Sequence, residues 1–181
     1  MLRLLLDTLT KGPRTIDAPV PDAASIAELA ARVAAVGRDR LGRSLSIREV
    51  DAGSCNGCEL EIHALNNPVY DLERFGIRFV ASPRHADVLL VTGPVTTNMR
   101  AALLDTWRAV PGPKWLVAAG DCAAGAGVFA GGHGVCGSGA VSDLLPVDLH
   151  VHGCPPRPID LLSGLLALLQ VADRPSVSDA G

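Results

Sequence analysis

The sequence lacks any long uninterrupted apolar segment, and aromatic side chains make up only 3% of its 181 residues. A helix that spans a membrane needs about 20 consecutive, predominantly apolar residues, and the longest candidate, residues 161–169, is about half that length. The apolar run at the start of the chain is too short for a signal peptide, and no cleavage site with small residues follows it. We therefore expect a cytosolic protein that meets a membrane only through partner proteins.

Blocks of basic residues are missing as well. The 16 Lys and Arg residues and the 19 Asp and Glu residues are mixed along the chain, and the formal net charge is −3. Proteins that bind nucleic acids usually carry a patch or stripe of positive charge. We therefore do not expect nucleic acid as a partner.

Short apolar segments alternate with helical patterns along the chain. The sequence predicts strands at residues 44–50, 77–81, 87–93, 114–120 and 147–151, and helices at residues 23–39, 59–65, 97–110 and 158–170. This alternation predicts a single α/β domain of the flavodoxin-like type, with a mostly parallel, twisted sheet flanked by helices. We place this domain at residues 22–170, after an extended arm at residues 1–21 and before a flexible tail at residues 171–181.

Four of the five cysteines follow predicted strands. Cys55 and Cys58 come after the strand at 44–50, Cys122 after the strand at 114–120, and Cys154 after the strand at 147–151. The carboxyl ends of parallel strands share one edge of the sheet, where ligands bind. These four thiols are therefore expected to converge. Cys136 breaks the pattern, because it lies inside a glycine-rich stretch.

Several kinds of chemistry fit such a set of thiols. Four thiolates suit an iron–sulfur cluster or a structural zinc ion. The Cys-x-x-Cys spacing of Cys55 and Cys58 also occurs in thioredoxin-type dithiols, and some of the cysteines could simply be buried in the core. Two prolines directly follow Cys154. A Cys-Pro step also occurs beside cluster ligands, and we therefore favour the cluster while zinc remains open.

Four segments together resemble a known family. They read GSCNGCELEI, ERFGIRFVASPRHADVLLVTGPVT, AAGDCA and PVDLHVHGCPPRPIDLLSGLLALL. The chain is similar, from about residue 45 to 170, to the small subunit of the group 4, membrane-bound [NiFe] hydrogenases, which include formate hydrogenlyase. The same superfamily contains the 20-kDa subunit of respiratory complex I, known in bacteria as the B subunit.

The resemblance implies one [4Fe–4S] cluster on Cys55, Cys58, Cys122 and Cys154. This cluster would relay electrons to or from the [NiFe] centre of a partner large subunit. The complex I branch has two adjacent cysteines at the first site, whereas here Asn56 and Gly57 separate them, as in the hydrogenase branch. The alternatives are a homologue of the complex I 20-kDa subunit that passes electrons to quinone, and a zinc-stabilised interaction module.

The resemblance also implies partners and a location. The partners would be a hydrogenase-type large subunit, a ferredoxin-like iron–sulfur subunit and membrane subunits similar to antiporters. The chain would be a peripheral component on the cytoplasmic side of the membrane, and it would not be catalytic alone. After Cys122 the family usually continues with two glycines, an aromatic stretch and a tyrosine, whereas this chain keeps Phe129 but is rich in glycine there and lacks that tyrosine. The contact of that loop with the large subunit is therefore not predicted.

Other residues near the expected cluster have candidate roles. Glycines next to the cysteines allow the backbone to approach a cluster closely, and we expect this of Gly53, Gly57, Gly120 and Gly153. Glu59 suits the first turn of a helix, where a carboxylate complements the helix dipole, and it is also a candidate proton relay. Asp121 is expected to be exposed or paired with Arg157. We interpret Cys136 as a spare thiol.

Overall fold

The structure is a computed structural model that describes residues 23–171. The expected arm at residues 1–21 and residues 172–181 of the expected tail lie outside the described residues. Four α-helices and five strands follow one another in the order α2 (Ala23–Leu41), β1 (Ser46–Asp51), α3 (Gly57–Ala64), β2 (Arg78–Phe79), β3 (Val88–Thr92), α4 (Arg100–Ala109), β4 (Trp115–Ala119), β5 (Leu149–Val151) and α5 (Pro158–Val171). Short 3₁₀ helices cover Leu72–Phe75, Pro83–His85 and Val141–Asp143.

The five strands form one sheet in the order β2-β1-β3-β4-β5, and every neighbouring pair is parallel. This is the strand order of flavodoxin-like folds. The predicted fold class is therefore confirmed. The order reverses at β1, which lies between β2 and β3, and ligands in such folds bind near this reversal, beyond the carboxyl ends of the strands.

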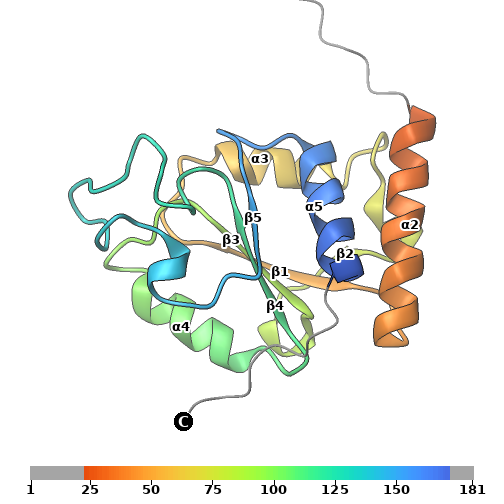
Figure 1. The fold of residues 1–181 in the computed structure, drawn as a ribbon, viewed down its shortest axis with the longest axis horizontal. Helices are drawn as coiled ribbons and strands as arrows, with labels where there is room; N and C mark the ends of the chain where they lie inside the picture. Colours follow the sequence, from red (N-terminus) through yellow and green to blue (C-terminus); the bar gives the residue numbers. More distant parts are fainter. Residues whose placement is uncertain (1–22, 172–181) are drawn as a thin grey trace, which may run out of the picture.

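Helices cover both faces of the sheet, which explains the sequence of the central strands. All five residues of β3 and all five of β4 are buried, as expected for parallel strands with helices on each side. Val88 and Leu90 belong to the core under α2, α3 and α5, whereas Leu89 and Val91 belong to the core under α4. Figure 1 shows α3, α5 and α2 on one side of the sheet and α4 on the other.

Helix α5 contributes one apolar face to the core. Its buried leucines are Leu161, Leu162, Leu165, Leu166, Leu168 and Leu169. The helix packs against both α2 and β5. The apolar run at residues 161–169 thus fills the interior of this domain. Because the strands are parallel, the segments after β1, β3, β4 and β5 all lie at the same edge of the sheet, and all four predicted cysteine ligands are in these segments.

Candidate metal centre

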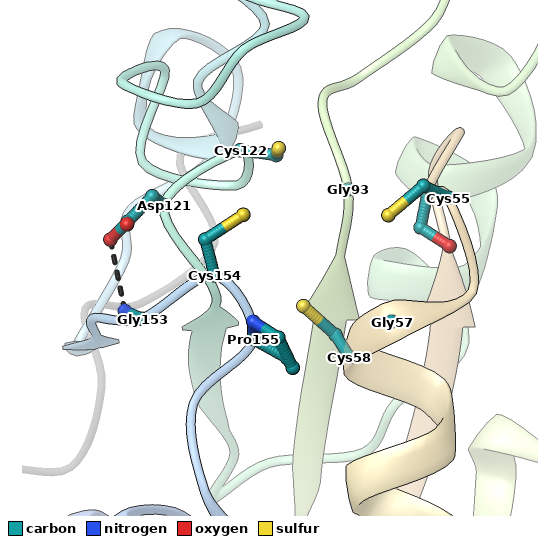
Figure 2. Close-up of a pocket in the computed structure, with 10 residues that line it drawn as sticks. Cys55, Gly57, Cys58, Gly93, Asp121, Cys122, Gly153, Cys154 and Pro155 are labelled. Carbon is teal, nitrogen blue, oxygen red and sulfur yellow. Dashed lines mark hydrogen bonds between the residues drawn. The ribbon is translucent and has the colours of Figure 1, made fainter. Parts of the chain in front are cut away.

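A cavity of about 100 Å³ lies at the carboxyl edge of the sheet. Residues from four separate loops line it: Ser54, Cys55, Gly57, Cys58, Gly93, Asp121, Cys122, Gly153, Cys154 and Pro155. Figure 2 shows Cys55 and Cys58 on one side and Cys122 and Cys154 on the other, with their sulfur atoms pointing toward the space between them. The structure therefore brings the four predicted thiols together around one cavity.

The loop after β1 is shaped by its own polar side chains. Asp51 Oδ1 accepts hydrogen bonds from the N–H groups of Gly53 at 2.7 Å and Ser54 at 2.6 Å. Asn56 adopts the left-handed conformation with a φ of 70°, and α3 starts at the next residue. Asparagine tolerates this conformation better than most residues. This turn places Cys55 in the loop and Cys58 in the first turn of α3.

The loops after β4 and β5 are joined by hydrogen bonds that continue beyond the two strands. The N–H of Gly120 donates to the carbonyl of Val151 at 2.8 Å, and the N–H of Asp121 donates to the carbonyl of Gly153 at 2.9 Å. Cys122 and Cys154 follow directly in their two loops. The pairing of β4 with β5 therefore sets the relative positions of these two thiols.

Two of the thiols resist ionisation. Burial, together with the charges of Glu59 and the three other cysteines of the cavity, raises the pKa of Cys58 to about 12. Burial and the charge of Cys154 raise the pKa of Cys122, although the backbone N–H of Phe129 donates to its sulfur and lowers that pKa. Four thiolates at this site therefore require nearby positive charge, which metal ions supply when they bind.

Within residues 23–171, no three His, Cys, Asp or Glu side chains are grouped so that they could hold one metal ion. The four thiols instead surround the cavity from opposite sides (Figure 2). A tetrahedral zinc ion would need all four sulfur atoms about 2.3 Å from one point. In a [4Fe–4S] cluster each cysteine binds a different iron atom, so the sulfur atoms are spread around the group. The arrangement fits the cluster better than a single ion.

The predicted glycines differ in how close they lie to the thiols. Gly57 and Gly153 line the cavity, and a Cβ atom on Gly120 would lie 2.6 Å from Cys58 Sγ. Gly53 is not among the lining residues. A Cβ atom on Gly53 would collide with Thr96 Cγ2, and its N–H donates to Asp51, so its amide is turned to the loop itself. The structure therefore gives Gly53 a role in the turn.

The site also contains two glycines that the sequence analysis did not predict, Gly93 and Gly127. Gly93 lines the cavity, and a Cβ atom there would collide with the backbone of Ser54. Gly93 directly follows β3, so its position at the carboxyl end of a predicted strand could have identified it as a site residue. Gly127 approaches Cys122, and a Cβ atom there would collide with Cys122 Sγ and lie 2.8 Å from its Cα. Nothing in the glycine-rich stretch distinguishes Gly127 from its neighbours.

Glu59 lies in the first turn of α3, as predicted, but it is buried, with 7% of its surface exposed. Neither of its carboxylate oxygens has a hydrogen-bond partner among the described residues. Glu49 on β1 interacts with it electrostatically: burial raises the pKa of Glu49, the charge of Glu59 raises it further, and His63 lowers it. A partnerless buried carboxylate next to a site residue is unusual, because burying such a group is costly.

Three candidates remain. Cys136 lies away from the cavity, and Arg157 and Asp121 interact with other residues than with each other. Cys136 does not line it, and its N–H donates to the carbonyl of Val95 at 2.8 Å. Arg157 forms an ion pair with Asp160, with Nε and Oδ2 2.9 Å apart. Asp121 was expected to be either exposed or paired with Arg157; the pair does not form, and the Asp121 side chain is partly exposed, at 34%. Asp121 instead accepts a hydrogen bond from the N–H of Gly153 at 2.9 Å (Figure 2).

The region that carries the four thiols matches a known family. The family described as NADH ubiquinone oxidoreductase, 20 kDa subunit, matches residues 55–168 of the chain. The chain belongs to this family. The matched region starts at Cys55 and includes Cys58, Cys122 and Cys154.

Relatives in this family come from several oxidoreductase complexes. The chain is 41% identical to formate hydrogenlyase subunit 7 of Escherichia coli, with 90% of this chain and 63% of the relative covered. It is 44% identical to the probable membrane-bound hydrogenase subunit mbhJ of Pyrococcus furiosus, with 72% of this chain and 77% of the relative covered. It is 45% identical to the B subunit of NADH-quinone oxidoreductase of Citrifermentans bemidjiense, with 61% and 64% covered. The chain thus spans less than two thirds of the first and third relatives.

A solved structure shares the fold. A chain of the membrane-bound sulfane sulfur reductase, an archaeal respiratory membrane complex, superposes with a TM-score of 0.61 at 33% identity, covering 71% of this chain and 70% of that chain. These comparisons confirm the expected family and the expected class, a component of an oxidoreductase complex. Within residues 23–171, none of the helices has both the length and the apolar character that a membrane crossing requires.

Proposed function

We propose that this chain is an electron-transfer subunit that carries one [4Fe–4S] cluster on Cys55, Cys58, Cys122 and Cys154. The observation that carries this proposal is the arrangement of four thiols, from the segments that follow three separate strands, around one cavity. Members of the family are generally iron–sulfur proteins, and the family match includes all four cysteines. The bound cluster would supply one-electron transfer.

The chain's own residues would bind and enclose the cluster. The four cysteines would act as thiolate ligands, and the rigid ends of the parallel strands would fix their positions. Gly57, Gly93 and Gly153 line the cavity without side chains, so the backbone can lie against the group there. Pro155 covers part of the cavity wall without adding an amide N–H.

We further propose that the electrons pass to or from the [NiFe] centre of a partner large subunit, in a membrane-bound hydrogenase of the formate hydrogenlyase type. The separation of Cys55 and Cys58 by two residues, which resembles the hydrogenase branch, supports this assignment. The similarity to formate hydrogenlyase subunit 7, which extends over 90% of this chain, supports it as well. The ferredoxin-like and membrane subunits of such a complex would hold the chain on the cytoplasmic side.

A partner would cover the cavity where it opens to solvent. Cys55 and Cys154 are exposed. The exposed large apolar side chains include Leu60 at 61%, Val128 at 82% and Phe129 at 43%. Leu60 follows Cys58 by two positions, and the N–H of Phe129 donates to the sulfur of Cys122. These three side chains therefore lie on segments next to the ligands, where the large subunit would exclude water from the cluster.

The decisive experiment combines iron analysis with ligand substitution. The complex purified from cells should contain, at this site, four iron atoms per copy of this chain and show a [4Fe–4S] electron paramagnetic resonance signal on reduction. Cys122→Ala should lose the cluster and the association with the large subunit. Cys136→Ala is the matched control and should keep its full iron content. Equal iron loss in both variants, or a colourless protein that contains zinc, would overturn the ligand assignment.

The second candidate is a complex I-like function in which this chain passes electrons to quinone. The 45% identity to the B subunit of an NADH-quinone oxidoreductase favours it. The partner large subunit separates the two candidates. A large subunit with two Cys-x-x-Cys pairs for nickel supports the hydrogenase, whereas quinone-dependent turnover with a large subunit that lacks these pairs supports the complex I-like function.

We also propose Glu59 as a proton relay beside the cluster. Its carboxylate is buried, has no hydrogen-bond partner in the described part of the chain and follows Cys58 directly. Glu49 interacts electrostatically with both Glu59 and His63, and the His63 side chain is exposed. Glu59→Gln should slow hydrogen evolution while the iron content stays at the wild-type value. Glu61→Gln is the control, and equal rates in both variants would contradict the relay.

A further inference from the structure

The Asp121 carboxylate joins the two loops that carry Cys122 and Cys154. It lines the cavity with both cysteines, and Oδ1 accepts a hydrogen bond from the N–H of Gly153 at 2.9 Å. In the same place the N–H of Asp121 donates to the carbonyl of Gly153, also at 2.9 Å. Two reciprocal hydrogen bonds therefore link the residue before Cys122 to the residue before Cys154.

This carboxylate is only partly compensated by positive charge. Its side chain is 34% exposed, and His152 Nδ1 lies 3.5 Å from Oδ1, a contact that becomes an ion pair only when the imidazole is protonated. The His152 side chain is 72% exposed, so water weakens that interaction. Arg157 is paired with Asp160 and does not compensate Asp121. The carboxylate thus adds negative charge directly at the cavity wall.

We propose that Asp121 is a positioning residue with two separable effects: its oxygen fixes the turn before Cys154, and its negative charge lowers the reduction potential of the cluster. This inference rests on the proposed function. Reduction adds one electron to a group already surrounded by four thiolates, and a nearby negative charge opposes that addition. Hydrogen bonds and charges around a metal group commonly tune it in this way.

Two substitutions separate the two effects. Asp121→Asn keeps an oxygen that accepts from Gly153 but removes the charge, so the iron content should stay at the wild-type value while the reduction potential becomes more positive. Asp121→Ala removes both, so iron per chain should fall. The clusters that remain in Asp121→Ala should show the same positive shift in reduction potential. Because alanine has no side-chain donor, an equal shift in both variants comes from the loss of the charge and not from a new hydrogen bond donated by the asparagine amide.

The matched control is Asp105→Asn. Asp105 is 75% exposed on α4, where it pairs with Arg108, and its substitution changes the net charge of the chain by the same amount. The reduction potential of this variant should equal that of the wild type. All variants should be measured in the purified complex, by titration of the [4Fe–4S] electron paramagnetic resonance signal against potential and by iron analysis.

The outcomes distinguish this inference from the proposed function. A wild-type complex without a [4Fe–4S] signal contradicts the proposed function itself. A normal wild-type signal together with an unshifted potential in Asp121→Asn overturns the inference alone. An equal shift in Asp105→Asn also overturns it, because the effect would then come from net charge and not from the position of Asp121. Full iron content in Asp121→Ala overturns the positioning role.

Discussion

At the residue scale, the site depends on places where a side chain is absent. Gly120 and Gly127 each lie so close to the sulfur of a cysteine that a Cβ atom would collide with Cys58 or Cys122. Gly93 supports the loop before Cys55 in the same way, through its contact with Ser54. Glycines thus lie against Cys58, against Cys122 and against the loop that holds Cys55, where any side chain would displace them.

Gly127→Ala should therefore remove Cys122 from its place. The added Cβ would meet Cys122 Sγ and the backbone of Cys122, with Cα at 2.8 Å and N at 2.9 Å, and backbone atoms cannot move aside cheaply. We expect a large loss of iron per chain, measured by iron analysis and visible absorption. An unchanged iron content in Gly127→Ala would show that the loop after β4 can move without losing the site.

A second prediction at this scale concerns Glu49. Burial and the charge of Glu59 raise its pKa above the ordinary value of 4.5. Because the folded-state pKa is the higher one, the stability that Glu49 contributes is present at low pH and is lost as the pH rises through that pKa. Glu49→Gln should therefore raise the thermal unfolding midpoint near pH 7, and the difference should narrow as the pH falls toward about 5.

The control for Glu49 is Glu28→Gln. Glu28 is exposed on α2. The unfolding midpoint of this variant should follow that of the wild type at every pH. A Glu49→Gln variant that is no more stable than Glu28→Gln near neutral pH would mean that Glu49 is better solvated than its burial indicates.

At the scale of the elements, the same substitution should have opposite effects in two helices. Gly37 lies inside α2, and a Cβ atom there would make ordinary contacts with Leu45 at 3.7 Å and Leu169 at 3.8 Å. Glycine inside a helix is less stable than alanine by roughly 0.5–1 kcal/mol. Gly37→Ala should therefore stabilise the protein by about that amount, as measured by chemical denaturation.

Gly164→Ala in α5 provides the contrast. Here a Cβ atom would lie 2.9 Å from Val151 Cγ2 and 3.2 Å from Leu149 Cδ2, because α5 packs closely on β5. Overpacking of this kind typically costs about 1–3 kcal/mol. The variant should be less stable than the wild type in the same denaturation experiment. Stabilisation by both substitutions would show that α5 can shift away from the sheet.

The helices and strands could be predicted from the sequence wherever one local pattern determines them. Helices α2 to α5 and strands β1 to β5 all form where their patterns lie. The segment at residues 77–81 was expected to be a full strand, but β2 covers only Arg78–Phe79. This strand is at the edge of the sheet and pairs with β1 alone, so few of its backbone groups are held. A local sequence pattern does not show whether a strand has one neighbouring strand or two, so the short length of β2 could not be predicted.

At the scale of the whole molecule, the convergence of the four cysteines follows from topology and could be predicted. Each cysteine follows a strand, and parallel strands end at one edge. The path of residues 124–139 could not be predicted, because it depends on contacts with a distant segment. The N–H of Val95 donates to the carbonyl of Gly139, and the N–H of Thr97 donates to the carbonyl of Gly134. These bonds explain why Gly127 and Cys136 were not placed from the sequence.

The exposed end of this loop leads to a prediction about assembly. Val128 is 82% exposed and lies beside Phe129. Val128→Asp should weaken association with the large subunit, because it places a charge in a surface that we expect a partner to cover, while the iron content is kept. Co-purification measures the association. Ala35→Asp, at an exposed position on α2, is the control and should assemble normally.

The order of the strands also has a consequence for biosynthesis. Cys154 follows β5, the last strand of the sheet to be made, and that strand lies at the edge of the sheet beside β4. A nascent polypeptide that has emerged only as far as the loop after β4 contains three of the four thiols of the site, and β4 has no neighbour on its outer side. The lining of the cavity is complete only when the segment after β5 has been made, so the binding of any group that needs all four sulfur atoms must wait until the last strand of the sheet has been synthesised.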